Sequence, residues 1–198
     1  MISEIWSIIL AAGESKRMGT PKMLLPFNGS TMIENVISNV TDSKTDRILV
    51  VLGSSGREIE KLIRTKSVNY CFNENYKDGM LSSVKCGLRN IPVGIRAVLI
   101  YQGDQPLISS STSDSIIDSY YASGRGIVIP VYNNRRGHPV LIDNKYRNEV
   151  EKLNPSVGLR SLSYKFSKDV VEVAVNDPGI LRDFDTYSEY EKAINQIS

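Results

Sequence analysis

The stretch IWSIILAAGESKRMGTPK, residues 5–22, determines how the whole chain is interpreted. It opens with a short apolar run, residues 5–10, which is typical of a buried strand in a parallel sheet. The loop that follows contains Gly13 and Gly19, and it carries hydroxyl and basic side chains: Ser15, Lys16, Arg17 and Lys22. Glycine lets backbone N–H groups approach an anion, and Arg and Lys neutralise it. The stretch therefore predicts phosphate binding; the alternative is a strand followed by a solvated basic loop.

Two common phosphate-binding motifs do not fit this loop. A P-loop requires four residues between its glycines and a lysine directly after the second one. Here five residues separate Gly13 from Gly19, and Lys22 comes after Thr20 and Pro21. The loop also lacks the dinucleotide fingerprint G-x-G-x-x-G. Neither of the commonest nucleotide-binding folds is therefore indicated.

Length and composition suit one globular domain, residues 1–198. The formal net charge is only +2, which does not favour a nucleic-acid or membrane-binding surface. The apolar run near the start could mimic a signal peptide, but Glu4 and no Lys or Arg precede it. No run reaches the length of a transmembrane helix. We therefore expect a cytoplasmic protein that binds neither nucleic acid nor membrane.

The chain contains two cysteines, Cys71 and Cys86, and one histidine, His138. The cysteines are far apart in the sequence and neither belongs to a C-x-x-C pair. This arrangement favours two buried thiols over a disulfide or a metal site. With a single histidine, zinc ligation by histidine and cysteine is not expected either.

Strand and helix patterns alternate along the whole chain. Thr31 and Glu34 form a capping box ahead of apolar residues at helical spacing, so a helix follows the first strand. Further strands are expected at residues 47–53, 68–72, 97–101, 126–132, 139–142 and 170–175. Further helices are expected at residues 57–63, 80–88, 109–123, 145–153 and 158–164, and after residue 186. The alternation predicts an α/β fold: a doubly wound, mostly parallel sheet with helices on both faces.

A second informative stretch is AVLIYQGDQP, residues 97–106, in which Asp104 follows a buried strand. In an open α/β sheet the ligand lies beyond the carboxyl ends of the strands, so Asp104 and the Gly13 loop would share one rim. Two like charges about 4 Å apart cost on the order of 4 kcal/mol, so a carboxylate beside bound phosphate needs a cation between them. Mg²⁺ bound by carboxylates and phosphate oxygens meets that need. The alternative is that Asp104 forms a turn ahead of Pro106.

These motifs resemble those of nucleotidyltransferases that make a nucleoside diphosphate linkage. L-A-A-G, residues 10–13, followed by S-K-R-M-G-T-P-K, residues 15–22, is most similar to the molybdenum cofactor cytidylyltransferase family. G-D-Q-P, residues 103–106, resembles the metal-binding motif of the same family. Guanylyltransferase relatives more often read LAGG with an aspartate before the lysine, where this chain has Ala12 and Pro21. The resemblance covers nearly the whole chain and implies a Rossmann-like nucleotidyltransferase fold.

The resemblance also implies which residues carry the chemistry. Arg17, Lys22 and Asp104 would be catalytic: Arg17 would hold the β and γ phosphates, and Lys22 would stabilise charge growing on the α-phosphate. Asp104 would bind Mg²⁺. The second ligand would be Asp185, because LRDFDTYSEYEKA resembles the D-I-D-T-P-E-D-Y ending of the family, or else Asp183. Capping of the C-terminal helix is the alternative for both aspartates.

Other residues would bind the two substrates. R-R-G-H-P resembles the family's R-x-G-H-P motif, so His138 and Arg136, or Arg135, would contact an anionic acceptor. The alternative is a structural histidine beside solvated arginines. Ser82 is a weaker candidate for the nucleotide, and helix capping is the alternative for both Ser82 and Ser83. The residues expected to bind the nucleotide are Leu10, Ala11, Ala12, Gly13, Ser15, Arg17, Lys22, Gly79 and Ser83.

The activity implied by the resemblance is Mg²⁺-dependent transfer of CMP from CTP to the phosphate of molybdopterin, with release of pyrophosphate. A molybdoenzyme client is implied as a further partner. The methyl groups of Ala11 and Ala12 favour cytosine because they could exclude the larger guanine. The alternatives within the superfamily are a guanylyltransferase and a sugar-phosphate or alcohol-phosphate nucleotidyltransferase. Alternatives from other classes are a non-catalytic nucleotide or cofactor carrier and a small-ligand α/β binding module.

Overall fold

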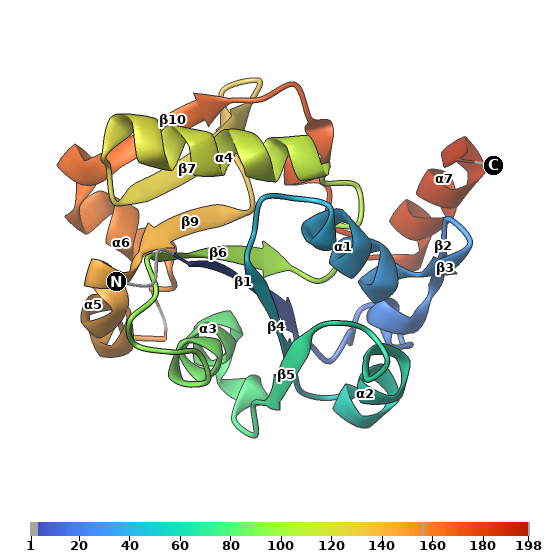
Figure 1. The fold of residues 1–198 in the computed structure, drawn as a ribbon. Helices are drawn as coiled ribbons and strands as arrows, with labels where there is room; N and C mark the ends of the chain where they lie inside the picture. The colour runs from blue at the N-terminus through green and yellow to red at the C-terminus, as the bar shows by residue number, and fades with distance from the viewer. Residues whose placement is uncertain (1–3, 156, 198) are drawn as a thin grey trace.

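The computed structural model describes residues 4–155 and 157–197 and is built around one large sheet (Figure 1). The strands are, in chain order, β1 (Ile5–Ala11), β2 (Pro26–Phe27), β3 (Ser30–Thr31), β4 (Arg47–Leu52), β5 (Asn69–Phe72), β6 (Ala97–Gln102), β7 (Ile127–Tyr132), β8 (Arg135–Arg136), β9 (Val140–Asp143) and β10 (Val170–Ala174). The order in the sheet is β10-β7-β9-β6-β1-β4-β5, and β8 pairs with β7. The pairs β1–β4, β1–β6, β4–β5 and β7–β10 are parallel. The predicted α/β fold with a mostly parallel sheet is confirmed.

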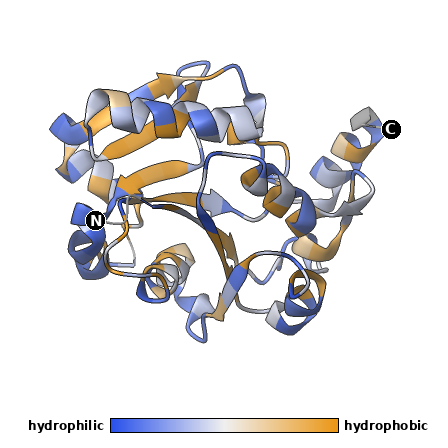
Figure 2. Cartoon of the chain, viewed as in Figure 1, coloured by the Kyte–Doolittle hydropathy of each residue, from blue (hydrophilic) through white to orange (hydrophobic). Residues whose placement is uncertain are grey.

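Helices cover both faces of the sheet. The α-helices are α1 (Met32–Thr41), α2 (Gly56–Ile63), α3 (Met80–Arg89), α4 (Ser110–Ser123), α5 (Arg147–Lys152), α6 (Arg160–Lys165) and α7 (Tyr187–Ile197). Short 3-10 helices are η1 (Lys22–Leu24), η2 (Tyr76–Asp78), η3 (Asn144–Tyr146), η4 (Ser167–Asp169) and η5 (Pro178–Leu181). Apolar residues of α1, α2 and α4 pack on one face, and those of α3, α5 and α6 pack on the other. Figure 2 shows central strands such as β7 and β9 mostly in hydrophobic colours, as burial between two layers of helices requires.

Strand β1 shows how the sequence fills both cores. Side chains of a strand alternate between the two faces. Ile5 and Ile9 lie in the core under α1, α2 and α4, whereas Trp6 and Ile8 lie in the core under α3. The apolar run in the sequence therefore reflects burial on both faces rather than one, as predicted for a central parallel strand.

The structure adds a hairpin between the expected strands at residues 126–132 and 139–142. Asn133 and Asn134 have φ of 48° and 60° and join β7 to β8. Asparagine tolerates this left-handed backbone better than most residues, so it suits a two-residue hairpin turn. The chain then returns as β9, which is antiparallel to both β6 and β7. The expected strand at residues 139–142 is present, and its start lies at the same edge of the sheet as the carboxyl ends of the parallel strands.

Helix α7 and the β2–β3 hairpin lie beside each other at one side of the molecule (Figure 1). Phe184 is 1% exposed, and its ring centroid lies 5.7 Å from that of Phe27 in the hairpin. The Tyr190 hydroxyl donates a hydrogen bond of 2.5 Å to the carbonyl of Pro26. Burial of Phe184 therefore anchors the segment that carries the aspartates on either side of it.

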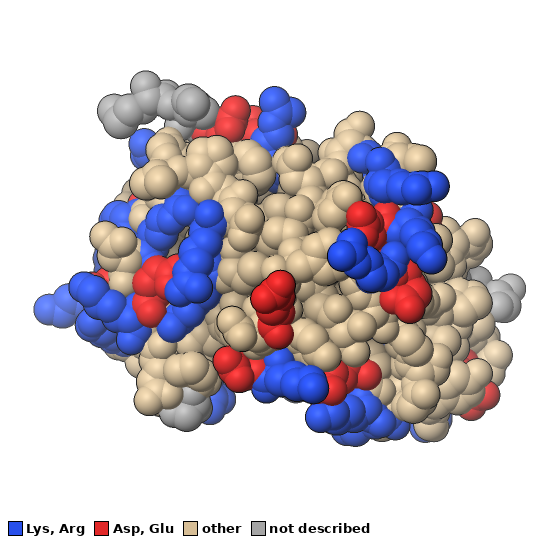
Figure 3. All heavy atoms as spheres, turned by 90° about the horizontal axis from the view of Figure 1, so that it is seen from below, with Lys and Arg blue, Asp and Glu red and all other residues tan. Residues whose placement is uncertain are grey.

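Two further features concern the length of the helices and the charge of one surface. In the part of the chain that the structure describes, no helix is long and apolar enough to cross a membrane. Figure 3 shows the lower face of the molecule, where Lys and Arg lie in separate groups together with Asp and Glu. Surface formed by other residues separates these groups, so their charges do not add up to one strong positive field on this face.

Candidate active site

Ser15 holds the loop after β1 in shape. Its Oγ accepts a hydrogen bond of 3.1 Å from the backbone N–H of Lys22. Its carbonyl accepts one of 3.0 Å from the N–H of Met18, and its φ of 52° lies in the left-handed region. These contacts fix the point where η1 begins, and Lys22 is the first residue of η1. Ser15 therefore positions the backbone of Lys22.

Four charged side chains from three distant parts of the sequence meet beyond the ends of β1 and β6. The Lys22 ammonium contacts the Asp104 carboxylate and lies 3.4 Å from that of Asp185. The Arg17 guanidinium lies 2.7 Å from the Asp185 carboxylate. Lys22 and Asp104 are largely buried, so water and salt screen their interaction little. Arg17, Lys22, Asp104 and Asp185 are called the charged centre below. Its two cations could pair with phosphate, and its two carboxylates could bind a metal ion.

A third carboxylate completes a candidate metal site. One oxygen each from Asp104, Asp183 and Asp185 lies within 4.8 Å of the others. Burial raises the pKa of the Asp183 carboxyl, and the neighbouring carboxylates of Asp185 and Asp104 add to this effect. Hard oxygen donors gathered in this way suit Mg²⁺ or a similar divalent cation. The residues present therefore fit a metal, and Asp183 and Asp185 are both placed to serve beside Asp104.

The charged centre lines a cavity of about 330 Å³ at the carboxyl ends of the strands. Ala11, by contrast, is buried in the core under α1, so its methyl group does not reach this cavity and cannot exclude guanine. The alternation of side chains along β1 explains the difference from Ala12, which does line the cavity. The predicted nucleotide-site and metal-site residues that line it are Leu10, Ala12, Gly13, Arg17, Lys22, Gly79, Ser83, Asp104, Asp183 and Asp185.

Ser82 and Ser83 differ in their surroundings. The Asn73 side-chain amide donates to both hydroxyls, at 2.9 Å to Ser82 and 3.0 Å to Ser83. The Ser82 hydroxyl also donates to the carbonyls of Asn75 and Gly79, each at 2.8 Å. Ser82 therefore ties the first turn of α3 to the preceding segment, whereas Ser83 is the one of the two that lines the cavity.

A second, larger cavity of about 610 Å³ adjoins the first, and Met80 lines both. Aliphatic side chains of β7, β9 and α6 form much of its wall, and Arg136, His138 and Arg160 contribute its basic groups. Gly137 lies between β8 and β9 and lets this segment approach η5, because a Cβ atom there would clash with the carbonyl oxygen of Ile180. The predicted acceptor residues His138 and Arg136 thus lie together, beside the cavity that carries the predicted catalytic residues.

Burial lowers the pKa of His138 from its ordinary value of 6.5, and the Asp104 carboxylate opposes this shift only in part. The unfolded chain therefore binds a proton more readily than the folded one. This contribution to stability is complete above pH 6.5 and is lost as the pH falls from 6.5 towards the lower folded pKa. Urea midpoints measured from about pH 7.5 to about pH 5 should thus fall more steeply for the wild type than for His138→Gln. Equal slopes would show that the histidine does not become harder to protonate on folding.

Some cavity residues were missed by the sequence analysis. Tyr76, Met80 and Gln102 line the first cavity, and Arg160 lines the second. Gln102 ends β6, so the strand-end argument that selected Asp104 could have selected it too. Tyr76 and Met80 flank the turn at Asp78 and Gly79. The family resemblance selected Gly79 in this turn but not the side chains on either side of it. The sequence motifs assigned no role to Arg160.

Comparison with known sequences agrees with this geometry. Residues 7–170 match the MobA-like NTP transferase domain family. The chain is 27% identical to the molybdenum cofactor cytidylyltransferase of Escherichia coli over 191 residues, 96% of this chain and 95% of that protein. It is 31% identical to the bifunctional protein GlmU of Clostridium tetani over 152 residues, 74% of this chain. The matched part spans only 33% of GlmU.

Solved structures share the fold. Rv0371c of Mycobacterium tuberculosis superposes with a TM-score of 0.88 at 25% identity, over 98% of this chain and 99% of that one. A nucleotidyl transferase from Methanothermobacter thermautotroptrophicus does so with a TM-score of 0.82 at 22% identity, over 98% and 97%. The resemblance inferred from the motifs is confirmed, and the protein is an enzyme of the nucleotidyltransferase type. The matched residues and the shared fold establish that this chain belongs to the MobA-like NTP transferase domain family.

Proposed function

We propose that this protein is a Mg²⁺-dependent cytidylyltransferase that transfers CMP from CTP to the phosphate of molybdopterin and releases pyrophosphate. The supporting observation is the charged centre, which lines a cavity beside the glycine loop and adjoins a second, more apolar cavity. The identity to the molybdenum cofactor cytidylyltransferase of Escherichia coli supports the same pair of substrates. The product would then pass to a molybdoenzyme in the cytoplasm.

The residues of the charged centre are suited to this reaction. A phosphate monoester is largely ionised near neutral pH, so its oxygen can attack the α-phosphorus of CTP without a general base. The new bond joins that oxygen to the α-phosphorus, and the bond to the β-phosphate breaks to release pyrophosphate. Arg17 neutralises the departing phosphates, and Lys22 neutralises charge on the α-phosphate. Asp104, Asp183 and Asp185 would hold Mg²⁺, which would add positive charge beside the phosphate oxygens.

Pyrophosphate release tests the proposal directly. The protein is incubated with Mg²⁺, CTP or GTP, and phosphorylated acceptors that include molybdopterin, a sugar phosphate and an alcohol phosphate. We expect release that requires both CTP and molybdopterin. Preference for GTP, or for another phosphate, would identify a different transferase of the superfamily. Nucleotide binding without any release would identify a carrier.

The second cavity is proposed to bind the acceptor. Its wall of Ile127, Ile129 and Ile142 suits a flat or apolar body, and its basic groups suit an anionic phosphate. Arg136 already pairs with Glu172 at 2.6 Å. This ion pair is exposed and therefore weak, so Arg136 stays available to an anion. We assign both Arg136 and Arg160, which line the cavity, to the acceptor.

Replacing Arg160 with glutamine is expected to raise the KM for the acceptor about ten- to a hundredfold and to leave the KM for the nucleotide unchanged. A hydrogen bond between charged groups contributes about 1.5–3 kcal/mol, which corresponds to that range. The matched control is Arg89→Gln, which removes an exposed arginine paired with Glu151 at 2.6 Å. Equal KM values for Arg160→Gln and the wild type would exclude Arg160 from the acceptor site.

A further inference from the structure

The two cysteines of the chain lie side by side, although 14 residues separate them in the sequence. Cys71 is in β5 and Cys86 is in α3, and their Sγ atoms are 3.8 Å apart. Both thiols are free and only half-buried. The sequence analysis predicted two buried thiols with no disulfide; the structure corrects this to two partly exposed thiols in contact.

Their surroundings give the two thiols different reactivity. Burial, with a smaller contribution from Cys86, raises the pKa of the Cys71 thiol to about 12. Cys71 is therefore a poor thiolate near neutral pH. Cys86 has a hydrogen-bond donor beside it, because the Asn90 side-chain amide lies 3.8 Å from its sulfur. Cys86 is thus the thiol that would react first.

We propose that Cys71 and Cys86 form an oxidative modification site, at which a small disulfide such as oxidised glutathione links β5 to α3. The Cys86 thiolate attacks one sulfur of the small disulfide and displaces one thiolate, leaving a mixed disulfide on Cys86. The displaced thiolate accepts the Cys71 proton. The Cys71 sulfur then attacks the Cys86 sulfur and displaces the second thiolate. Two protein thiols are oxidised to one disulfide, and one small disulfide is reduced to two thiols.

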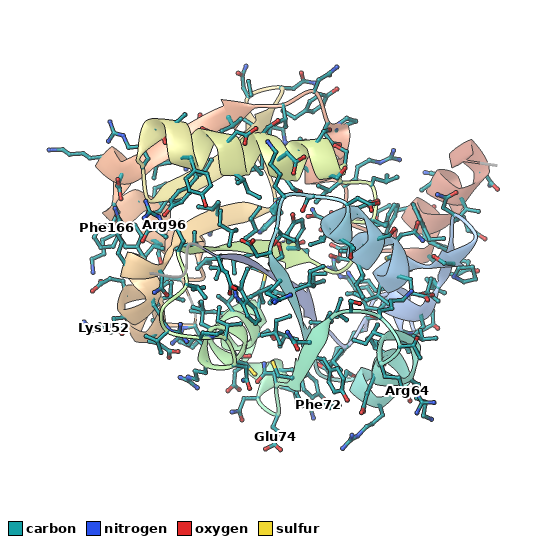
Figure 4. All side chains as sticks on the ribbon, in the orientation of Figure 1. Arg64, Phe72, Glu74, Arg96, Lys152 and Phe166 are labelled. Atoms are coloured by element: carbon teal, nitrogen blue, oxygen red, sulfur yellow. The ribbon has the colours of Figure 1, made fainter. Side chains whose placement is uncertain are left out.

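We expect closure of the bond to shift β5 rather than α3. A disulfide measures about 2.0 Å, so the two sulfur atoms must approach by about 1.8 Å. Helix α3 cannot move closer to the sheet at Gly87, where a Cβ atom would lie 2.8 Å from Ile8 and 3.1 Å from Val51. β5 is an edge strand with one neighbour, β4, and Figure 4 labels Phe72 and Glu74 at the rim where the chain leaves it. The edge strand β5 can therefore shift towards α3 more readily than α3 can shift towards the sheet.

Movement of β5 would change the shape of the first cavity. Asn73 follows β5 directly, and its side-chain amide holds Ser82 and Ser83 at the start of α3. Ser83, Tyr76 and Gly79 line the cavity proposed to bind the nucleotide. Oxidation should therefore weaken nucleotide binding, and this consequence rests on the proposed function. Formation of the bond itself does not depend on that function.

The full-length protein is incubated with oxidised glutathione, and its free thiols, intact mass and Kd for CTP with Mg²⁺ are measured. We expect both thiols to disappear, the mass to fall by the two lost hydrogens, and the Kd to rise about fivefold or more, an ordinary size for coupling between sites. Dithiothreitol should reverse all three changes. The matched controls are Cys71→Ser and Cys86→Ser, which should bind CTP like the reduced wild type. Cys86→Ser should keep that affinity in oxidised glutathione, whereas Cys71→Ser should retain a glutathione adduct on Cys86, because it lacks the thiol that displaces the second thiolate.

Several results would overturn this proposal. One is that both free thiols persist in oxidised glutathione, and another is that the mass of the wild type shows a stable adduct of one glutathione. A third is a disulfide between two chains on a non-reducing gel, and the last is an internal disulfide that leaves the Kd for CTP unchanged. Failure of the reduced protein to bind CTP would instead count against the proposed function, because the thiol and mass measurements would still report whether the bond forms.

Discussion

Replacing Asp104 with asparagine is expected to lower the rate of pyrophosphate release about 10²–10³-fold, the usual loss when one preorganised charge contact is removed. Asp104 is 8% exposed, contacts the Lys22 ammonium and is one of the three clustered carboxylates. Asparagine keeps the shape of the side chain but removes its charge. Lys22 loses its main partner and the candidate metal site loses a ligand, so both parts of the charged centre are damaged at once.

A second aspartate provides the control for this substitution. Asp118 is exposed on α4, and its carboxylate lies 2.7 Å from the Lys44 ammonium. Asp118→Asn removes the same charge and the same kind of ion pair at a distance from both cavities, so its rate should match that of the wild type. Circular dichroism and urea unfolding would establish that both variants fold. A folded Asp104→Asn variant with the wild-type rate would remove Asp104 from the mechanism.

The sequence was sufficient to predict most of the fold because the relevant signals are local. Burial on both faces makes β1, β4 and β6 continuous apolar runs, and helical spacing behind the Thr31 capping box marks α1. The rule that ligands lie beyond the ends of parallel strands then brought the Gly13 loop and Asp104 to one rim. That expectation needed no knowledge of which strands pair, because all parallel strands end at the same edge.

What escaped prediction depends on pairing and packing at long range. The sequence of β9 does not reveal that it lies antiparallel between β6 and β7. The side chains of β1 are apolar on both faces. The sequence therefore does not show on which face the side chain of Ala11 lies. The contact between Cys71 and Cys86 exists only because β5 lies beside α3, and no spacing in the sequence indicates it. The second cavity also forms only when α6 packs over β7 and β9.

Replacing Lys22 with methionine is expected to separate two properties of the charged centre. The rate of pyrophosphate release should fall about 10²–10³-fold, because the charge that grows on the α-phosphate loses its nearest cation. Affinity for a divalent cation without nucleotide should rise about tenfold or more, because the ammonium no longer neutralises Asp104 and Asp185. Methionine preserves much of the length of the side chain, so the cavity keeps its shape. Mn²⁺ titration and single-turnover release measure the two effects.

The matched control is Lys44→Met, because Lys44 also pairs with an aspartate but does so on the surface. It should leave both the release rate and the Mn²⁺ affinity unchanged. A Lys22→Met variant with unchanged Mn²⁺ affinity would show that the ammonium does not screen the carboxylates. A variant with the wild-type release rate would show that Lys22 does not act on the reacting phosphate. The combination of slower release and tighter metal binding is distinctive, because general damage to the fold would weaken both, and only a lysine shared between carboxylates and phosphate gives opposite signs.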